Sequence, residues 1–461
     1  MKIKIVGAAG GEVTGSAYLI QTATAKIMVD AGMFQGGKAT EEKNRLPEGA
    51  DPRQLDALLL THAHLDHTGR VPLLLRHGYR NAIYATSATL DLAEIVLQDS
   101  ARIQIQDASR KNRYHPEKHA EPLYTPEDMI SFRSQGKSVE LHQPIPVADG
   151  ITARFYEAGH MLGSTSIELT VQENGSSKVI VFSGDLGPYE QPIVRPFETL
   201  PYADLVFLES TYGNRDHRPY FETMKEFEEI IQKVVQQKGK ILIPAFAIGR
   251  TQQILYHLAI LFFQKKVAPF PVFVDSPMAI EAGKVFAHHP DLFDTEATDW
   301  KNQGLLPLDR TWFKFTTSVE ESKKLNNLNG PCAILAGAGM CNAGRIQHHL
   351  KFNLPHPATQ VLIVGYQGYG SLGRLLVDGA KQVKIHGETI DVKATVHTLN
   401  GLSAHAGQND LLKWFTSLAK EKPRVILTHG ENPQREALAS EIKKSFNLKS
   451  LLPQLNEVVE V

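Results

Sequence analysis

The side chains best suited to chemistry lie in one short segment, Thr61-His62-Ala63-His64-Leu65-Asp66-His67. Imidazole nitrogens and carboxylate oxygens of this kind are preferred ligands of zinc. The apolar residues 58–60 come directly before the segment and predict a buried strand, so the ligands lie on the loop at its end. The alternation lets His62 and His64 point one way while Asp66 and His67 point another. This pattern suits two metal ions that share a loop, and the alternative is a polar loop with incidental histidines.

Two metal ions need more ligands than one loop supplies, and three other predicted strands end close to a suitable side chain. His160 follows residues 155–159, Asp185 follows residues 179–184, and His429 follows residues 425–428. A single histidine at a strand end is more often a hydrogen-bonded structural residue. Three such strand ends, in a chain that already holds the 61–67 segment, favour a metal site instead.

The elements that must position these residues fall into three stretches. The first 200 residues predict mainly strands, with a helix over residues 87–109. The expected strands are residues 2–6, 17–21, 26–29, 57–60, 151–157, 166–171, 179–182 and 204–208. The middle alternates between helices and strands, which favours a parallel sheet. Its expected elements are the helices 222–236, 250–263 and 277–287 and the strands 240–243, 272–274, 333–335 and 360–364.

After about residue 390 the sequence pattern again resembles that of the first 200 residues. Its expected elements are the strands 393–398 and 424–427 and the helices 409–419 and 433–445. A chain of 461 residues is too long for one ordinary core, so two domains are the default. We therefore expect residues 1–210 and 391–461 to form one domain, into which residues 211–390 are inserted as an α/β domain.

Composition limits the partners and the compartment. Hydrophobic residues make up 42% and charged residues 21% of the chain, which is typical of a globular protein. The net charge is -1, so any affinity for nucleic acid must come from a local groove or from bound cations. The two cysteines, Cys332 and Cys341, fit neither a zinc motif nor a disulfide framework. The most apolar run, residues 258–263, is too short to span a bilayer, and we expect a cytoplasmic protein with no membrane partner.

Taken together, these segments resemble the β-CASP branch of the metallo-β-lactamase superfamily. The ligand loop, His160 and Asp185 resemble the superfamily, and further segments resemble the branch. Those further segments are residues 207–213 (Phe-Leu-Glu-Ser-Thr-Tyr-Gly), 244–250 (Pro-Ala-Phe-Ala-Ile-Gly-Arg), 275–279 (Asp-Ser-Pro-Met-Ala), 339–345 (Gly-Met-Cys-Asn-Ala-Gly-Arg), 365–367 (Gly-Tyr-Gln), 402–406 (Leu-Ser-Ala-His-Ala) and 428–431 (Thr-His-Gly-Glu). The resemblance covers essentially the whole chain. It implies an α/β protein, built as an αββα metallo-β-lactamase sandwich with an inserted parallel-sheet β-CASP domain.

The resemblance also implies two Zn²⁺ per chain. One ion would be held by His62, His64 and His160. The other would be held by Asp66, His67 and His429, with Asp185 bridging the two. Asp30 matches a family aspartate that supports the ligand loop, and the alternative for it is a simple turn-former.

By the same resemblance, the expected reaction is phosphodiester hydrolysis by a metal-bridging hydroxide. Glu209 and His405 match a family pair in which the histidine is the general acid and the carboxylate orients it. With Asp66, they are the expected catalytic residues. Gly407 stands where many relatives carry an aspartate, which puts the tuning of His405 in doubt.

Glycine-flanked arginines of the inserted domain are the expected substrate contacts. Arg250, Arg345 and Arg374 each follow a glycine, and Ser371 lies in the same segment as Arg374. Such groups can bind phosphate oxygens, while Tyr366 or Tyr369 could stack a base. The alternative for each arginine is a tight turn with a solvent-facing side chain.

The sequence thus favours a zinc-dependent ribonuclease that cuts single-stranded RNA endonucleolytically. RNA is preferred because DNA-acting relatives typically lack a histidine at the position of His429. A 5′–3′ exoribonuclease of the same family and a DNA nuclease are the nearest alternatives. An RNA-binding scaffold without activity and a small-ester or thioester hydrolase are more distant ones. The sequence leaves a homodimer open.

Overall fold

The computed structural model describes residues 1–114, 119–306, 310–365, 367–368, 370–399 and 401–461. The chain divides into two compact units. The first unit contains Met1–Tyr189, Val194–Asp216 and His405–Val461, and the second contains Glu190–Ile193 and His217–Ala404.

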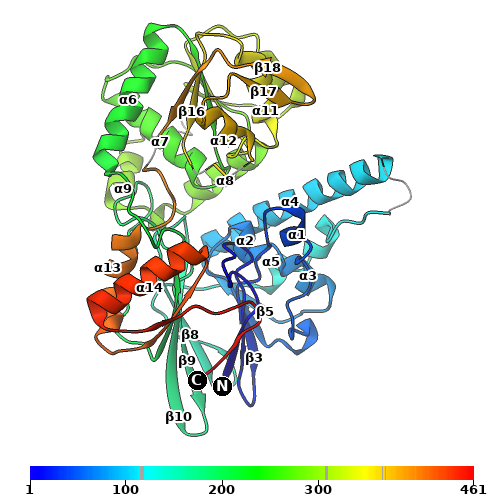
Figure 1. The fold of residues 1–461 in the computed structure, drawn as a ribbon, viewed down its shortest axis with the longest axis vertical. Coiled ribbons are helices and arrows are strands. Elements are labelled where there is room, and N and C mark those ends of the chain that lie inside the picture. Colours follow the sequence, from blue (N-terminus) through cyan, green and yellow to red (C-terminus); the bar gives the residue numbers. More distant parts are fainter. Residues whose placement is uncertain (115–118, 307–309, 366, 369, 400) are drawn as a thin grey trace. The chain divides into compact units, whose positions relative to one another are not determined.

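The first unit is built on two seven-stranded sheets. The first sheet has the order β22 (Val458–Glu460), β1 (Lys2–Ile5), β2 (Tyr18–Gln21), β3 (Lys26–Val29), β4 (Ala57–Leu59), β5 (Ala82–Ala85) and β6 (Gly136–Ser138). The second has the order β21 (Ser450–Leu451), β20 (Arg424–Thr428), β11 (Leu205–Glu209), β10 (Ser176–Phe182), β9 (Thr165–Glu173), β8 (Ile151–Glu157) and β7 (Ile145–Ala148). Because β22 pairs with β1, the two ends of the chain lie together (Figure 1).

The two sheets pack face to face because every second strand residue is apolar. Ile27 and Leu59 of the first sheet share one buried cluster with Phe155 and Phe207 of the second. This cluster is the core on which the strand ends rest.

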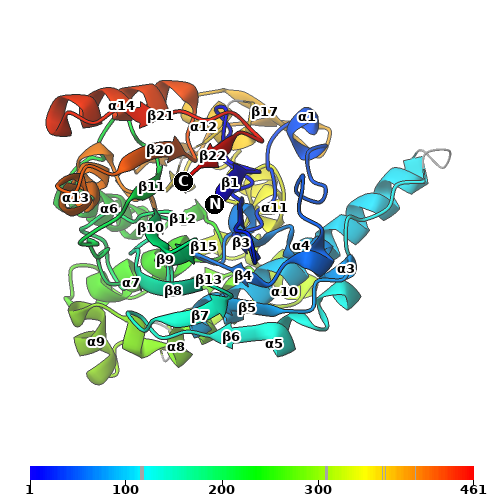
Figure 2. The same ribbon diagram turned by 90° about the horizontal axis from the view of Figure 1, so that it is seen from below.

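Helices cover the outer faces of both sheets. They are α1 (Lys38–Glu41), α2 (Leu65–Thr68), α3 (Val71–Arg76), α4 (Ser87–Tyr114), α5 (Phe132–Gln135), α13 (Gln408–Ala419) and α14 (Asn432–Phe446). Trp414 of α13 and Leu438 of α14 pack against Val206 and Leu427 on the outer face of the second sheet. Figure 2 shows α13 and α14 beyond β20 and β11, with α3, α4 and α5 along the other sheet. The layers are those of an αββα sandwich, as expected.

The second unit contains a parallel sheet with helices on both faces. Its strand order is β14 (Phe313–Phe315), β13 (Val272–Val274), β15 (Cys332–Ala336), β12 (Lys240–Pro244), β16 (Gln360–Ile363) and β19 (Thr395–Thr398). A hairpin of β17 (Gln382–Ile385) and β18 (Glu388–Asp391) lies outside this sheet. The helices are α6 (Tyr220–Gln236), α7 (Arg250–Phe263), α8 (Pro277–His288), α9 (Thr295–Asn302), α10 (Val319–Leu325), α11 (Arg345–Asn353) and α12 (Leu372–Val377).

Alternation along β12 explains why both faces are covered. Ile241 and Ile243 face the cluster that contains α6 and α7, whereas Leu242 faces the cluster that contains α11 and α12. All strand pairs in this sheet are parallel. The expected fold class, a sandwich with an inserted parallel-sheet domain, is therefore confirmed.

The unit boundaries differ from the expected ones. The sequence places residues 391–404 with the C-terminal segment, but β19 pairs with β16 over Gln360–Ile363 and completes the parallel sheet of the second unit. Residues 211–216 lie with the first unit instead of the second. The first 200 residues also contain more helix than expected, including α3 beside the ligand loop. Among the described residues, no helix has the length and apolar character that a bilayer crossing requires.

Candidate metal centre

The expected ligands converge because several strands of the first unit end at one edge. Strands β8, β10, β11 and β20 run in the same direction, so their carboxyl ends meet. Strand β4 brings the 61–67 loop from the other sheet. The converging side chains form three groups around a shared Asp185, with the ligand atoms of each group within 4.8 Å of one another. Two of them contain the expected ligands: His62, His64, His160 and Asp185, and Asp66, His67, Asp185 and His429. The third contains Asp185, Glu209 and His405.

The donor atoms of these groups are arranged as they would be around cations. His64 Nδ1 lies 3.0 Å from His160 Nε2, and His67 Nε2 lies 3.1 Å from His429 Nε2. His62 Nε2 and Asp185 Oδ1 are buried and have no hydrogen-bond partner among the described residues. An unsatisfied buried polar atom costs about 1–3 kcal/mol, which a cation at these atoms would offset. The chemistry and placement of the seven side chains therefore fit divalent metal ions.

Charge in the centre also favours cations. Burial lowers the pKa of His62 and His64, which keeps their imidazoles neutral and able to bind metal. Burial would raise the pKa of Asp185, but the surrounding histidines outweigh it and hold that pKa well below its usual range. Burial would lower the pKa of His67, but the carboxylates of Asp185 and Asp30 raise it well above the ordinary value. The carboxylates that would hold a proton on His67 would equally hold a metal ion in its place.

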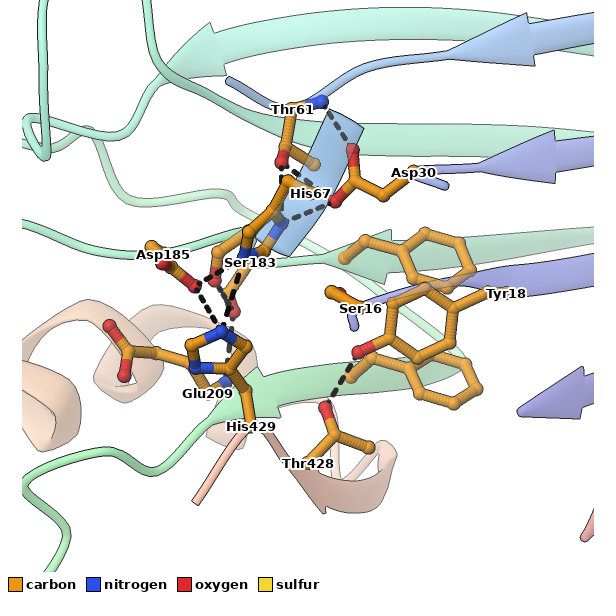
Figure 3. A pocket seen from close by; sticks show the side chains of 13 residues that line it. Ser16, Tyr18, Asp30, Thr61, His67, Ser183, Asp185, Glu209, Thr428 and His429 are labelled. Carbon is orange, nitrogen blue, oxygen red and sulfur yellow. Dashed lines mark hydrogen bonds and ion pairs between the residues drawn. The ribbon is translucent and has the colours of Figure 1, made fainter. Parts of the chain in front are cut away.

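Side chains behind the ligands fix their orientation (Figure 3). Asp30 lies 2.7 Å from His67 Nδ1 and accepts hydrogen bonds from the amide and the hydroxyl of Thr61, both at 2.8 Å. On the other side of the centre, Thr211 Oγ1 lies 3.1 Å from His429 Nδ1. Partners of this kind set the tautomer and the ring plane of a metal-binding histidine. Sequence reasoning assigned no role to Thr61 and Thr211, although each lies inside a segment singled out there.

Packed aromatic rings lie beneath the strand ends that carry the expected ligands. The rings of Phe182 and Phe207 stack on each other with centroids 4.7 Å apart, and the ring of Tyr18 packs against both at 5.0 and 5.1 Å. The Tyr18 hydroxyl is hydrogen-bonded to Thr428 Oγ1 at 2.7 Å, next to His429 (Figure 3). The strand ends that carry the expected ligands are therefore supported by packed rings.

Glu209 and His405 lie against this centre. The Glu209 carboxylate accepts hydrogen bonds from the amides of Leu186 at 2.9 Å and Thr211 at 3.1 Å. His405 Nδ1 lies 3.3 Å from Glu209 Oε1 and 3.9 Å from Asp185 Oδ2. Burial lowers the pKa of His405, but the Glu209 and Asp185 carboxylates outweigh it and raise that pKa to about 9. The two carboxylates thus favour the protonated form of the imidazole beside the ligand cluster.

The expected substrate contacts all lie in the second unit, where each has a structural partner. Arg345 forms an ion pair with the buried Asp275 at 2.6 Å, and Ser371 caps α12 by accepting a hydrogen bond from the amide of Arg374. Arg250 is buried and donates to Gln253 Oε1 at 2.7 Å. Arg374 pairs with Asp378 at 2.9 Å. Their contact with substrate stays a prediction, and Tyr366 and Tyr369 lie outside the described residues.

Comparison with known proteins agrees with this architecture. Residues 10–245 match the metallo-beta-lactamase superfamily, residues 251–376 match the Beta-Casp domain, and residues 389–453 match the Zn-dependent metallo-hydrolase RNA specificity domain. Ribonuclease TTHA0252 from Thermus thermophilus is 41% identical over 442 residues, which are 95% of each chain. Transcription termination factor FttA from Thermococcus kodakarensis is 29% identical over 473 residues, covering 98% of this chain and 70% of that protein.

A solved structure shares the fold alone. It is a protein of unknown function from Enterococcus faecalis V583, with a TM-score of 0.57, 12% identity, and coverage of 100% of this chain and 99% of that one. The fold and the centre define a metal-dependent hydrolase, a nuclease that uses divalent cations. The chain belongs to the metallo-β-lactamase superfamily, in its β-CASP family.

Proposed function

We propose that the chain is a zinc-dependent endoribonuclease that acts on single-stranded RNA and binds two Zn²⁺. The main support is the meeting of seven ligand side chains with the Glu209–His405 pair at one sheet edge. The relative from Thermus thermophilus is named a ribonuclease, and the RNA specificity domain matched at residues 389–453 contains His405 and His429.

In this proposal, His62, His64 and His160 would hold one zinc ion and Asp66, His67 and His429 would hold the other, with Asp185 available to both. When bound, zinc supplies Lewis-acid stabilisation of the phosphoryl oxygens and lowers the pKa of water toward neutrality. Asp66 is half-buried and lies 3.5 Å from His429 Nε2, where its carboxylate keeps the ligand imidazole in place.

His405 then acts on the leaving group. Attack of a water oxygen on phosphorus forms a new P–O bond and breaks the bond to the departing nucleotide oxygen. The water loses a proton to the solvent, and the departing oxygen needs one. The protonated His405 imidazole, held through Nδ1 by Glu209, gives that proton. Glu209 itself is fixed by two backbone amides and is therefore an orienting residue.

Digestion of RNA labelled at both the 5′ and the 3′ end tests the proposal. With the zinc-loaded chain, both the 5′-labelled and the 3′-labelled RNA should give fragments of intermediate length, because the cuts are internal. Release of mononucleotides would instead identify a 5′–3′ exoribonuclease. A DNA oligonucleotide of the same sequence is the matched control, and equal cleavage of it would favour a DNA nuclease. An intact RNA after incubation with the metal-loaded chain would refute the proposal.

The cytoplasmic location and the homodimer stay predictions. Cell fractionation tests the location, and light scattering tests the dimer.

A further inference from the structure

A second cavity of the first unit has no part in the metal centre. Its volume is about 450 Å³, which is within the range of small-ligand sites. Rings form most of its wall, and charged or hydroxyl groups complete it. The lining residues are His142, Tyr156, Tyr189, Phe197, Glu198, Thr199 and Lys413.

One residue of the cavity wall, Tyr189, is close in sequence to the metal centre. Tyr189 lies four residues beyond Asp185, so chain geometry alone keeps their Cα atoms within about 14 Å. The segment between them is fixed on two sides. Gly187 donates its amide hydrogen to the carbonyl of Ala158 at 3.0 Å, and Leu186 accepts one from Ala406 at 2.7 Å. A strand bound at the centre therefore needs only a few nucleotides to reach the cavity.

The rings are placed as a stacking platform. Phe197 is buried and meets the ring of Tyr189 edge-on, with centroids 5.3 Å apart. Tyr189 itself is 41% exposed, and the side chain that lies over its ring is that of Lys413, which is long and flexible and can move aside for a base. Stacking of a base on an aromatic side chain suits single-stranded nucleic acid because every base has a π face.

The polar groups at the rim match the rest of a nucleotide. The Lys413 ammonium lies over the Tyr189 ring and can pair with a phosphate beside a stacked base. Glu198 and His142 form an ion pair at 2.7 Å and offer an acceptor and a donor to a base edge. An apolar peptide side chain in the cavity would form no polar contact with Lys413, Glu198 or His142.

We infer that this cavity binds one nucleotide of the RNA substrate, with its base on Tyr189 and a neighbouring phosphate at Lys413. The inference rests on the proposed function and names a substrate subsite outside the metal centre. It explains how a chain with a net charge of -1 could still hold RNA.

The test compares Tyr189→Ala and Lys413→Gln with two controls of the same type, Tyr202→Ala and Lys420→Gln. Tyr202 is 43% exposed, which matches Tyr189, and Lys420 follows the same helix as Lys413. A 12-nucleotide single-stranded RNA and bis(4-nitrophenyl) phosphate serve as long and short diesters. We expect Tyr189→Ala to lower the selectivity for RNA over the short diester about tenfold, through KM, because one stacked base is lost. Tyr189→Phe keeps the ring and should restore most of the selectivity.

A binding measurement separates this inference from the proposed function. In the His405→Ala background, fluorescence anisotropy should show about tenfold weaker binding of the labelled RNA after Tyr189→Ala, and little change after Tyr202→Ala. Equal binding by these two variants overturns the inference and leaves the cavity to a protein partner, even if the RNA is cleaved normally. A different outcome would refute only the nuclease proposal. In that case the wild-type chain does not cleave RNA, but Tyr189→Ala still weakens RNA binding.

Discussion

At the residue scale, the imidazole of His405 is the group on which turnover should depend most. It lies against Glu209 and Asp185 but outside the two ligand groups that hold His62, His160 and the other expected ligands. We expect His405→Ala to keep its metal and to lose about 10²- to 10⁴-fold in kcat, the usual contribution of a general acid. Cleavage of labelled RNA gives the rate, and elemental analysis gives the metal content. His288→Ala, an exposed helix position, is the control, and full activity of His405→Ala would remove this residue from the mechanism.

The pH profile tests the Glu209–His405 pair. Because the pKa of His405 is raised to about 9, above its ordinary 6.5, the imidazole is protonated at neutral pH. Its stabilising ion pair is fully present below pH 6.5 and is lost as the pH rises through about 9, together with its capacity as an acid. Glu209→Gln removes one carboxylate and should move the alkaline limb of kcat to lower pH by about 1 unit or more. An unchanged limb would show that Glu209 does not tune His405.

At the element scale, the loop after β3 limits where the ligand loop can lie. A Cβ added at Gly32 would lie 1.6 Å from the carbonyl oxygen of Asp66, so the backbone that carries Asp66 and His67 would have to move. We expect Gly32→Ala to weaken metal binding about 10- to 100-fold, as loss of a ligand's support does. Competition with a chromophoric chelator measures it. Gly37→Ala is the matched control, since its Cβ would meet no atom within 4 Å.

Two arginines of the second unit should behave differently when replaced. Arg345 is one of four side-chain partners of Asp275, which is fully buried. Arg345→Ala should therefore lower the free energy of unfolding by about 1–3 kcal/mol. Arg374→Ala removes an exposed ion pair with Asp378, so the free energy of unfolding should change by less than about 0.5 kcal/mol, while KM for RNA rises if the predicted phosphate contact exists. Urea unfolding and RNA kinetics on both variants separate the two roles, and equal stability losses would contradict this distinction.

Element prediction from sequence succeeded where periodicity was long and failed where pairing was distant. Residues 250–263 match the bounds of α7, because apolar spacing with a helical period is a local property. Strand β19 resembles the strands of the first unit in sequence, and only its register with β16 assigns it to the parallel sheet. Short elements such as α3 carry too few residues for a periodic signal.

At the scale of the whole molecule, the centre depends on residues more than 360 positions apart. His67 and His429 are contributed by opposite ends of the chain, yet their Nε2 atoms lie 3.1 Å apart. The strand-end motifs predicted each ligand separately, and the parallel pairing of β11 with β20 places His429 beside Glu209. The supporting bonds from Thr61 and Thr211, and the cavity at Tyr189, depend on tertiary placement that no local pattern contains.

Anomalous diffraction at the zinc absorption edge, on crystals of the active chain, tests the central claim most directly. We predict two peaks per chain, one among His62, His64 and His160 and the other among Asp66, His67 and His429, with Asp185 contacting both. Asp185→Asn crystals should show at least one of the peaks weakened. A fully active chain whose anomalous peaks lie away from these side chains would contradict the account.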